Sequence, residues 1–107
     1  MIFIQILEVV ADLSVKQDIN KLIDKTISTF GRLDVLVNNA GIVGQTDIED
    51  NDIEEKFDQI MNTNVRSIVR LCHLAVPYLK QTKGNIVSVS SVASTKPVRN
   101  ISKNDFN

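Results

Sequence analysis

The sequence predicts an α/β fold with a parallel sheet, and three observations support this prediction. A continuous apolar run at residues 33–37 has the pattern of a strand covered on both faces, as parallel sheets require. Strand-like and helix-like stretches alternate along the chain, which is typical of βαβ units. A polar turn at residues 38–41 follows the apolar run directly. Ligands of parallel sheets bind just beyond the carboxyl ends of the strands, so this turn is the first candidate for a binding site.

The first half of the chain reads as strand, helix, strand. Residues 4–11 are rich in β-branched and apolar residues and predict a strand. A helix is expected next, because Ser14 and Gln17 have the spacing of a capping box. Gly31 favours the end of this helix, and a right-handed crossover to the strand at residues 33–37 is expected. The predicted inner face of the helix consists of Val15, Ile19, Leu22, Ile23, Ile27 and Phe30.

A long helix is predicted over residues 52–80, after an acidic loop and with a bend near residues 62–64. Its apolar stripe advances in steps of three and four and consists of Phe57, Met61, Val65, Ile68, Cys72, Ala75 and Leu79. Pro77 is expected to break the last turn locally. A final strand is predicted over residues 85–91.

Three side chains of the long helix carry separate expectations. Cys72 falls on the stripe and is expected to be a small core residue. His73 lies one step away and is expected at or near the surface rather than as a metal ligand. Asn64 falls within the stripe, and a polar amide there needs partners, because an unpaired one costs about 1–3 kcal/mol.

Composition excludes several classes of function. The chain has 107 residues, which suffice for one small domain, and its net charge of −1 does not favour a nucleic acid or an anionic membrane as partner. No apolar run reaches the roughly 18 residues of a membrane span. Cys72 is the only cysteine, so an internal disulfide is excluded and a reducing compartment, the cytoplasm, is expected. No metal site is predicted.

The residues after the central strand, Asn38, Asn39, Ala40 and Gly41, resemble the Asn-Asn-Ala-Gly signature of the short-chain dehydrogenase/reductase family. The resemblance implies that they brace the central strand and line the adenosine side of a nicotinamide cofactor, NAD or NADP. The alternative is that these residues only tie the turn to a neighbouring strand.

Asp12 is a second candidate for cofactor binding. The surrounding residues, Val-Ala-Asp-Leu-Ser at positions 10–14, are similar to the family pattern at the end of its third strand. The resemblance implies that Asp12 holds the adenine ring, and a carboxylate can accept a hydrogen bond from an exocyclic amine. The alternative is an acid favoured by the dipole of the following helix, and the two roles can coexist.

Asn64 and Ser91 are the catalytic candidates. Asn64-Val65 resembles the helix asparagine of the family, which holds a water in the proton relay; the alternative is a kink asparagine that bonds a backbone carbonyl. Ser91 matches the family serine that hydrogen-bonds the substrate carbonyl and the hydroxyl of the catalytic tyrosine. The alternative for Ser91 is a structural serine that bonds its own turn.

The chain departs from the family pattern at both ends. The family proton donor belongs to a Tyr-x-x-x-Lys pair, but the position four residues before Lys103 is occupied by Arg99. Lys103 is also closer to Ser91 than the family spacing implies, and the only tyrosine, Tyr78, lies upstream of Ser91. The Gly-rich turn that binds pyrophosphate in the family has no counterpart in the sequence, nor do the two strands that the family sheet places between residues 4–11 and 33–37.

Residues 1–107 are therefore expected to form a single, partial, Rossmann-like NAD(P)-binding domain. The expected fold is an incomplete doubly wound parallel sheet with about three strands and two or three helices. The implied reaction is hydride transfer between NAD(P) and a small-molecule carbonyl or alcohol, and this chain alone is expected to be inactive. The alternative is a non-catalytic chain that pairs with itself or with a full-length family member through the helix at residues 52–80.

Overall fold

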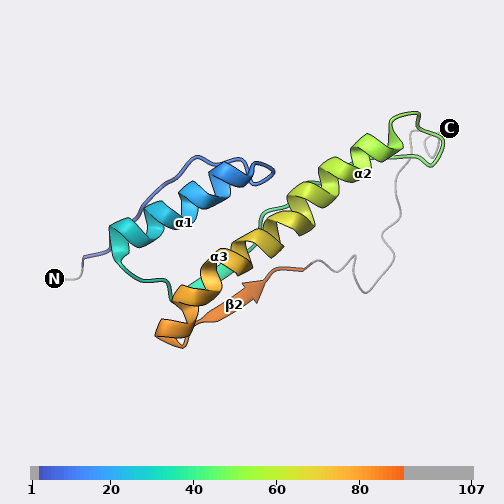
Figure 1. Ribbon diagram of the computed structural model, residues 1–107. Helices are drawn as coiled ribbons and strands as arrows, with labels where there is room; N and C mark the ends of the chain where they lie inside the picture. The colour runs from blue at the N-terminus through green and yellow to red at the C-terminus, as the bar shows by residue number, and fades with distance from the viewer. Residues whose placement is uncertain (1–2, 91–107) are drawn as a thin grey trace.

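The structure, a computed structural model, describes residues 3–90 (Figure 1). Along these residues the elements follow in the order α1 (Lys16–Phe30), β1 (Val35–Asn38), α2 (Ile53–Met61), a π-helical turn η1 (Asn62–Arg66), α3 (Ser67–Thr82) and β2 (Asn85–Ser88). The alternation confirms the predicted α/β class. Both strands are shorter than predicted, since β1 begins at Val35 and β2 ends at Ser88.

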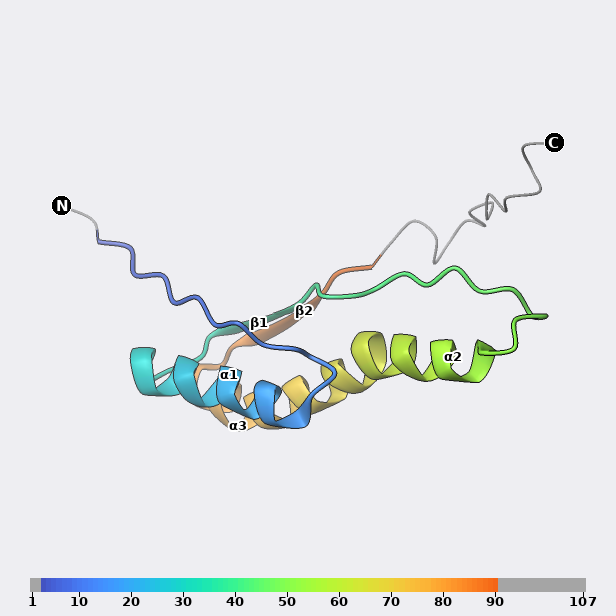
Figure 2. The same ribbon diagram turned by 90° about the horizontal axis from the view of Figure 1, so that it is seen from above.

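The two strands form a parallel sheet in which Val35 pairs with Asn85 and Asn38 with Ser88. The N–H of Asn85 donates to the carbonyl of Asp34 at one end, over 3.0 Å, and the N–H of Val89 donates to Asn38 at the other, over 2.9 Å. Figure 2 shows α1 and α3 on the same side of the sheet. The parallel register brings the carboxyl ends of both strands to one edge.

The predicted strand at residues 4–11 is wrong in the structure. These residues carry no strand assignment and pair with no strand among residues 3–90. They run alongside α1, and their exposure alternates: Leu7, Val9 and Ala11 are half-buried, whereas Ile4, Ile6 and Val10 are exposed (Figures 1 and 2). The β-branched composition produces an extended segment, but a strand also needs a hydrogen-bonded neighbour.

Helix α1 ends as predicted but begins differently. Gly31 has φ +72° and its N–H bonds the carbonyl of Ile27, which is the left-handed C-cap expected of glycine. The prediction of a capping box is wrong, because the N-cap residue is Val15 and no side chain caps the helix. The hydroxyl of Ser14 donates instead to the carboxylate of Asp12 over 2.6 Å.

The long helix bends where the sequence predicts a bend. The π-helical turn at Asn62–Arg66 separates α2 from α3, and an extra residue in such a turn changes the helix direction. The prediction for Pro77 is wrong, because α3 continues through it to Thr82. No helix within residues 3–90 is long and apolar enough to cross a membrane.

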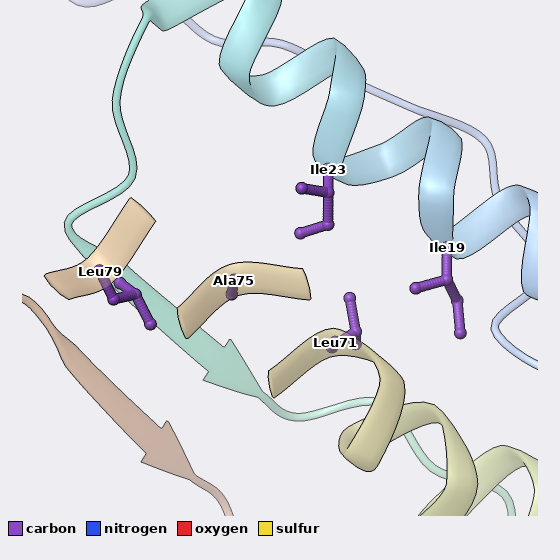
Figure 3. Packing of buried hydrophobic residues seen from close by; sticks show 5 residues of the cluster. All are labelled: Ile19, Ile23, Leu71, Ala75 and Leu79. Atoms are coloured by element: carbon purple, nitrogen blue, oxygen red, sulfur yellow. The ribbon is translucent and has the colours of Figure 1, made fainter. Parts of the chain in front are cut away.

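The core is small and lies between α1 and α3 (Figure 3). Its five buried hydrophobic residues are Ile19, Ile23, Leu71, Ala75 and Leu79. The predicted α1 face is thus buried at its centre, while Val15 and Phe30 at its ends are exposed. The predicted stripe of the long helix reaches the core only near its end, because Phe57 is 59% exposed and Cys72 is half-buried rather than buried.

The end of α3 is tied closely to the start of β1. The hydroxyl of Thr82 donates to the carbonyl of Leu33 over 2.8 Å. A Cβ on Gly84 would clash with the carbonyl oxygen of Asp34, so only glycine allows β2 to start this close to the residue that precedes β1. These contacts hold the two strands in register at the end opposite the candidate site.

Candidate functional site

The four signature residues lie at the carboxyl end of β1, as predicted. Asn38 is its last residue and is buried, with 6% of its surface exposed. Asn39, Ala40 and Gly41 follow it and are exposed. Because β2 runs parallel, its carboxyl end lies at the same edge, with Val89 bonded to the carbonyl of Asn38.

Asn64 connects this edge to the bent helix. Its side-chain Oδ1 accepts a hydrogen bond from the N–H of Ile42, and its Nδ2 donates to the carbonyl of Ile42, each over 2.7 Å. The carboxamide thus satisfies both backbone groups of a residue in the loop that follows the signature. A Cβ on Gly41 would lie 3.4 Å from Oδ1 of Asn64, at the near limit of ordinary van der Waals contact, so the asparagine packs directly against this turn.

The π-helical turn is what carries Asn64 to the loop. A π turn rotates the residues that follow it relative to a regular helix, so a polar side chain can leave the apolar face. The backbone-carbonyl contact expected of a kink asparagine is present, but its acceptor belongs to the loop and not to the helix. The water-relay role of Asn64 stays a prediction.

Asn38 reaches in the opposite direction, towards α3. Its Nδ2 donates to the Sγ of Cys72 over 3.7 Å, which is a weak hydrogen bond. Its Oδ1 is buried and has no hydrogen-bond partner among the described residues. A buried acceptor without a donor costs about 1–3 kcal/mol, so this side chain is under-satisfied at the end of the central strand.

Asp12 lies in the turn before α1, and its carboxylate serves that turn. Its Oδ1 accepts from both the hydroxyl and the N–H of Ser14, over 2.6 and 2.9 Å. These two bonds, the side-chain one first, hold the pKa of the Asp12 carboxyl below its ordinary value of 3.8. The carboxylate is fully exposed and stays charged at neutral pH, so it remains chemically able to accept an amine donor.

The other catalytic candidate is Ser91. Ser91 and Lys103 lie outside the described residues, as does Arg99. Tyr78 is described: it lies on α3, half-buried against the core, and lines a groove between α1 and α3 with Asp24. The structure therefore brings together the signature residues and Asn64, while Asp12 is held in a separate turn.

The sequence interpretation missed the partners of the site. Ile42 takes part only through its backbone, which no side-chain pattern reveals. Cys72 was expected as a core residue and instead contacts the carboxamide of Asn38. The one available signal was Asn64 itself, since an amide within an apolar stripe needs a partner.

The acidic loop before α2 holds a local ion-pair cluster. The ammonium of Lys56 lies 2.9 Å from Asp50 and 3.3 Å from Asp52. Hydrogen bonds from the N–H of Asp47 and from Lys56 lower the pKa of Asp50, and the two carboxylates raise the pKa of Lys56. Within residues 3–90 no group of three or more metal-ligating side chains occurs.

Comparison with known proteins identifies the family. The family model described as short chain dehydrogenase matches residues 4–103. An 11-beta-hydroxysteroid dehydrogenase-like protein (4A) of Arabidopsis thaliana is 44% identical over 91 residues, which are 85% of this chain and 30% of that protein. The crystal structure of the KRED1-Pglu enzyme is similar with a TM-score of 0.76 and 36% identity, covering 83% of this chain and 37% of that one.

A third relative is the apo-form of the glucose dehydrogenase of Caenorhabditis elegans, with a TM-score of 0.66 and 41% identity over 79% of this chain and 32% of that one. The chain belongs to the short-chain dehydrogenase family, whose members are oxidoreductases with a Rossmann fold. It spans about a third of the length of the relatives that it matches.

Proposed function

We propose that this chain is the central part of an NAD(P)-dependent oxidoreductase that transfers hydride between the cofactor and a carbonyl or alcohol. We also propose that residues 1–107 form one partial domain, which does not catalyse this reaction on its own. The observation that carries the proposal is the edge built by Asn38, Asn39, Ala40 and Gly41 and clamped by Asn64. A cofactor-binding edge must hold an exposed loop in one conformation, and the paired bonds to Ile42 do so.

Two separate turns offer polar groups of the kind that one end of a dinucleotide needs. The exposed turn at residues 39–41 and the charged, exposed carboxylate of Asp12 offer the polar groups that an adenosine needs. When bound, the nicotinamide ring supplies or accepts the hydride. Asn38 and Asn64 would fix the turn against which the adenosine lies, and Ser91 would hydrogen-bond the substrate carbonyl.

Two absences in the sequence limit what this chain does alone. No Gly-rich turn is available for the pyrophosphate, which normally takes its hydrogen bonds from backbone N–H groups at a helix N-terminus. The proton donor is also missing, since Arg99 is always charged and cannot serve as a general acid near neutral pH. General acid–base catalysis typically contributes about 10²–10⁴-fold, and that factor is lost here.

A binding titration tests the cofactor part. The isolated chain should bind NAD(H) or NADP(H) no more tightly than about millimolar, because the missing pyrophosphate contacts supply much of the usual affinity. Calorimetry with both cofactors gives the answer, with Asp12→Asn as a variant that should weaken any residual adenosine binding. Micromolar binding would contradict the proposal.

An activity assay tests the catalytic part. The purified chain, with a panel of ketones and both reduced nicotinamides, should show no reduction, and Ser91→Ala should change nothing measurable. Thr95→Ala is the matched control for Ser91→Ala. Reduction that the Ser91→Ala variant loses and the Thr95→Ala variant keeps would show that the chain is a working enzyme.

A second candidate function is association with another family member through the long helix. Apolar side chains line its outer face: Phe57, Met61, Val65 and Val69 are exposed by 38–63%. A shallow groove beside them is lined by Ile68, Val69, Cys72, His73, Val76 and Pro77. Co-purification with a full-length relative, lost in a Val69→Lys variant, would favour this function, and a strictly monomeric chain would oppose it. For either function we propose a cytoplasmic location.

A further inference from the structure

A groove between α1 and α3 lies outside the candidate site. It has a volume of about 430 Å³, within the range of about 300–1,000 Å³ that is usual for small-molecule sites. Its lining residues belong to the two helices, whereas the candidate site lies at the carboxyl edge of the sheet. Ile23 belongs both to the core and to the groove, so the packed core supports one wall of the groove (Figure 3).

Four polar side chains line the groove, two from each helix. They are Asn20 and Asp24 of α1 and His73 and Tyr78 of α3. Among residues 3–90 none of the four side chains takes part in a hydrogen bond or an ion pair. In this part of the chain Asp24 stays unpaired even though Lys21 lies three residues before it on the same helix. The four groups are therefore available to a ligand that replaces the hydrogen bonds of water.

The groove is rich in hydrogen-bond acceptors and carries one negative charge. The carboxylate of Asp24 only accepts, Asn20 and Tyr78 each offer an acceptor oxygen, and no lysine or arginine among the described residues lines the groove. Pro77 adds a further acceptor, because without an N–H it leaves the carbonyl of His73 without the donor that a regular helix supplies. An ammonium group has three donors and no acceptor, so it complements these groups, whereas an anion would meet the carboxylate.

The rest of the groove is apolar. Its apolar lining consists of Ile23, which is buried, Leu74, which is half-buried, and Pro77, which is exposed. Tyr78 adds a half-buried aromatic ring, and a cation within about 6 Å of the centre of such a ring is attracted to its face. A ligand that fits the groove therefore joins an ammonium group to a compact apolar body.

We propose that the groove between α1 and α3 binds a small primary ammonium compound with a compact apolar body. The ammonium group donates to the carboxylate of Asp24 and lies against the ring of Tyr78, and the body lies on Ile23, Leu74 and Pro77. No bond is made or broken in the ligand. Because the groove shares no residue with the edge that follows β1, this binding is independent of NAD(P) and of the proposed oxidoreductase function.

The test is a titration of the full chain, followed by nuclear magnetic resonance, with benzylammonium as the probe. It is run at about pH 8, above the usual titration range of imidazole. The amide signals of Asp24, His73 and Tyr78 should shift and saturate with a Kd of about 1 mM, which is reasonable for so small a ligand in an open groove. Benzyl alcohol has the same ring without the charge, and benzoate has the opposite charge. Both should bind about fivefold more weakly or worse.

Two pairs of variants assign the contacts. Asp24→Asn removes the charge from the groove and should weaken benzylammonium binding by about three- to fivefold, as the loss of an exposed ion pair would. Glu55→Gln removes the same charge from an exposed position on α2 and should leave the affinity unchanged. Tyr78→Leu removes the ring and should weaken binding by about two- to fivefold, whereas Tyr78→Phe keeps the ring and should retain it. Circular dichroism without ligand confirms that each variant keeps its helices.

Four other outcomes overturn the proposal. Equal binding of benzyl alcohol would show that the groove takes only an apolar body, and tighter binding of benzoate would make it an anion site. Shifts centred on Val69 and Cys72 instead of Asp24 would place the probe in the neighbouring groove on the outer face of α3. Absence of saturable shifts up to about 20 mM benzylammonium, a concentration well above the expected Kd, would remove the site altogether.

Discussion

At the scale of single residues, side-chain amides organise the candidate site. Asn64 satisfies both backbone groups of Ile42, whereas Asn38 makes one weak bond and leaves its buried Oδ1 without a donor in the described chain. The two asparagines thus act oppositely: one orders a loop, and the other remains open to a further contact. Charged side chains near the site, such as that of Asp12, are exposed and form hydrogen bonds with neighbouring residues in the chain.

Replacing Asn64 by leucine should release the loop after β1. The variant loses two hydrogen bonds of 2.7 Å, each worth about 0.5–1.5 kcal/mol, so the free energy of unfolding should fall by about 1–3 kcal/mol. Amide exchange at Ile42 should become fast. Asn62→Leu is the matched control, because no side-chain hydrogen bond of Asn62 is found among residues 3–90. Equal effects of the two variants would contradict the role of Asn64.

The ion pair at Asp34 should make stability depend on pH in the acid range. Arg32 donates two hydrogen bonds to its carboxylate, over 2.6 and 2.9 Å, and lowers its pKa from the ordinary 3.8. A depressed pKa in the folded state stabilises above the unfolded value and is lost as pH falls through the folded value. Asp34→Asn should therefore lower the urea midpoint slightly at pH 7 and not at all near pH 2. The effect is small, because the pair is exposed.

At the scale of elements, the long helix combines two irregular features. The π-helical turn at Asn62–Arg66 directs Asn64 towards the loop, and Pro77 lies inside α3 without ending it. The π-helical turn positions a residue of the candidate site, whereas Pro77 lies further along α3 on its exposed face. Replacing Pro77 should therefore change the stability of α3 and leave the candidate site unchanged.

Pro77→Ala should stabilise α3. Proline has no N–H to bond the carbonyl of His73 one turn before it, and a proline in a helix interior costs about 3 kcal/mol relative to alanine. Because alanine also gives the unfolded chain more freedom, the net gain should be about 1–2 kcal/mol. Thermal melts measure it, with Val69→Ala as the control at an exposed position of the same helix. A loss of stability would show that the proline is needed where it is.

At the scale of the whole molecule, the chain buries little. Its radius of gyration is 17.8 Å, compared with about 13 Å for a compact chain of this length. Within residues 3–90 the core holds five buried hydrophobic residues, and many large apolar side chains are exposed. Such a chain has too little buried apolar surface for ordinary stability without further partners.

The thermal unfolding transition should accordingly have a low enthalpy and extend over a broad range of temperature. A typical chain of 100 residues unfolds with an enthalpy of about 60–80 kcal/mol, and this one should fall well below that range. Calorimetry at micromolar concentration, with sedimentation to confirm the oligomeric state, measures it. A sharp melt of ordinary enthalpy from a monomer would show that the small core suffices.

The sequence by itself determined the features that depend on neighbouring residues. The apolar run and its polar turn predicted β1 and its carboxyl edge, and Gly31 predicted the end of α1. A bend was expected near residues 62–64, where the π-helical turn lies. Each depends on local backbone preference or on periodicity, which a single sequence contains. The family signature also follows from local residues, and the comparisons confirm the family that it indicated.

Only the tertiary structure decided the features that depend on distant partners. Residues 4–11 have strand composition but no neighbouring strand, so they remain an extended segment. Asn64 finds its partner 22 residues away in the backbone of Ile42, and Asn38 finds Cys72 34 residues away. Hydrogen bonds of this kind form where the fold brings a donor and an acceptor together, and no pattern along the chain encodes that distance.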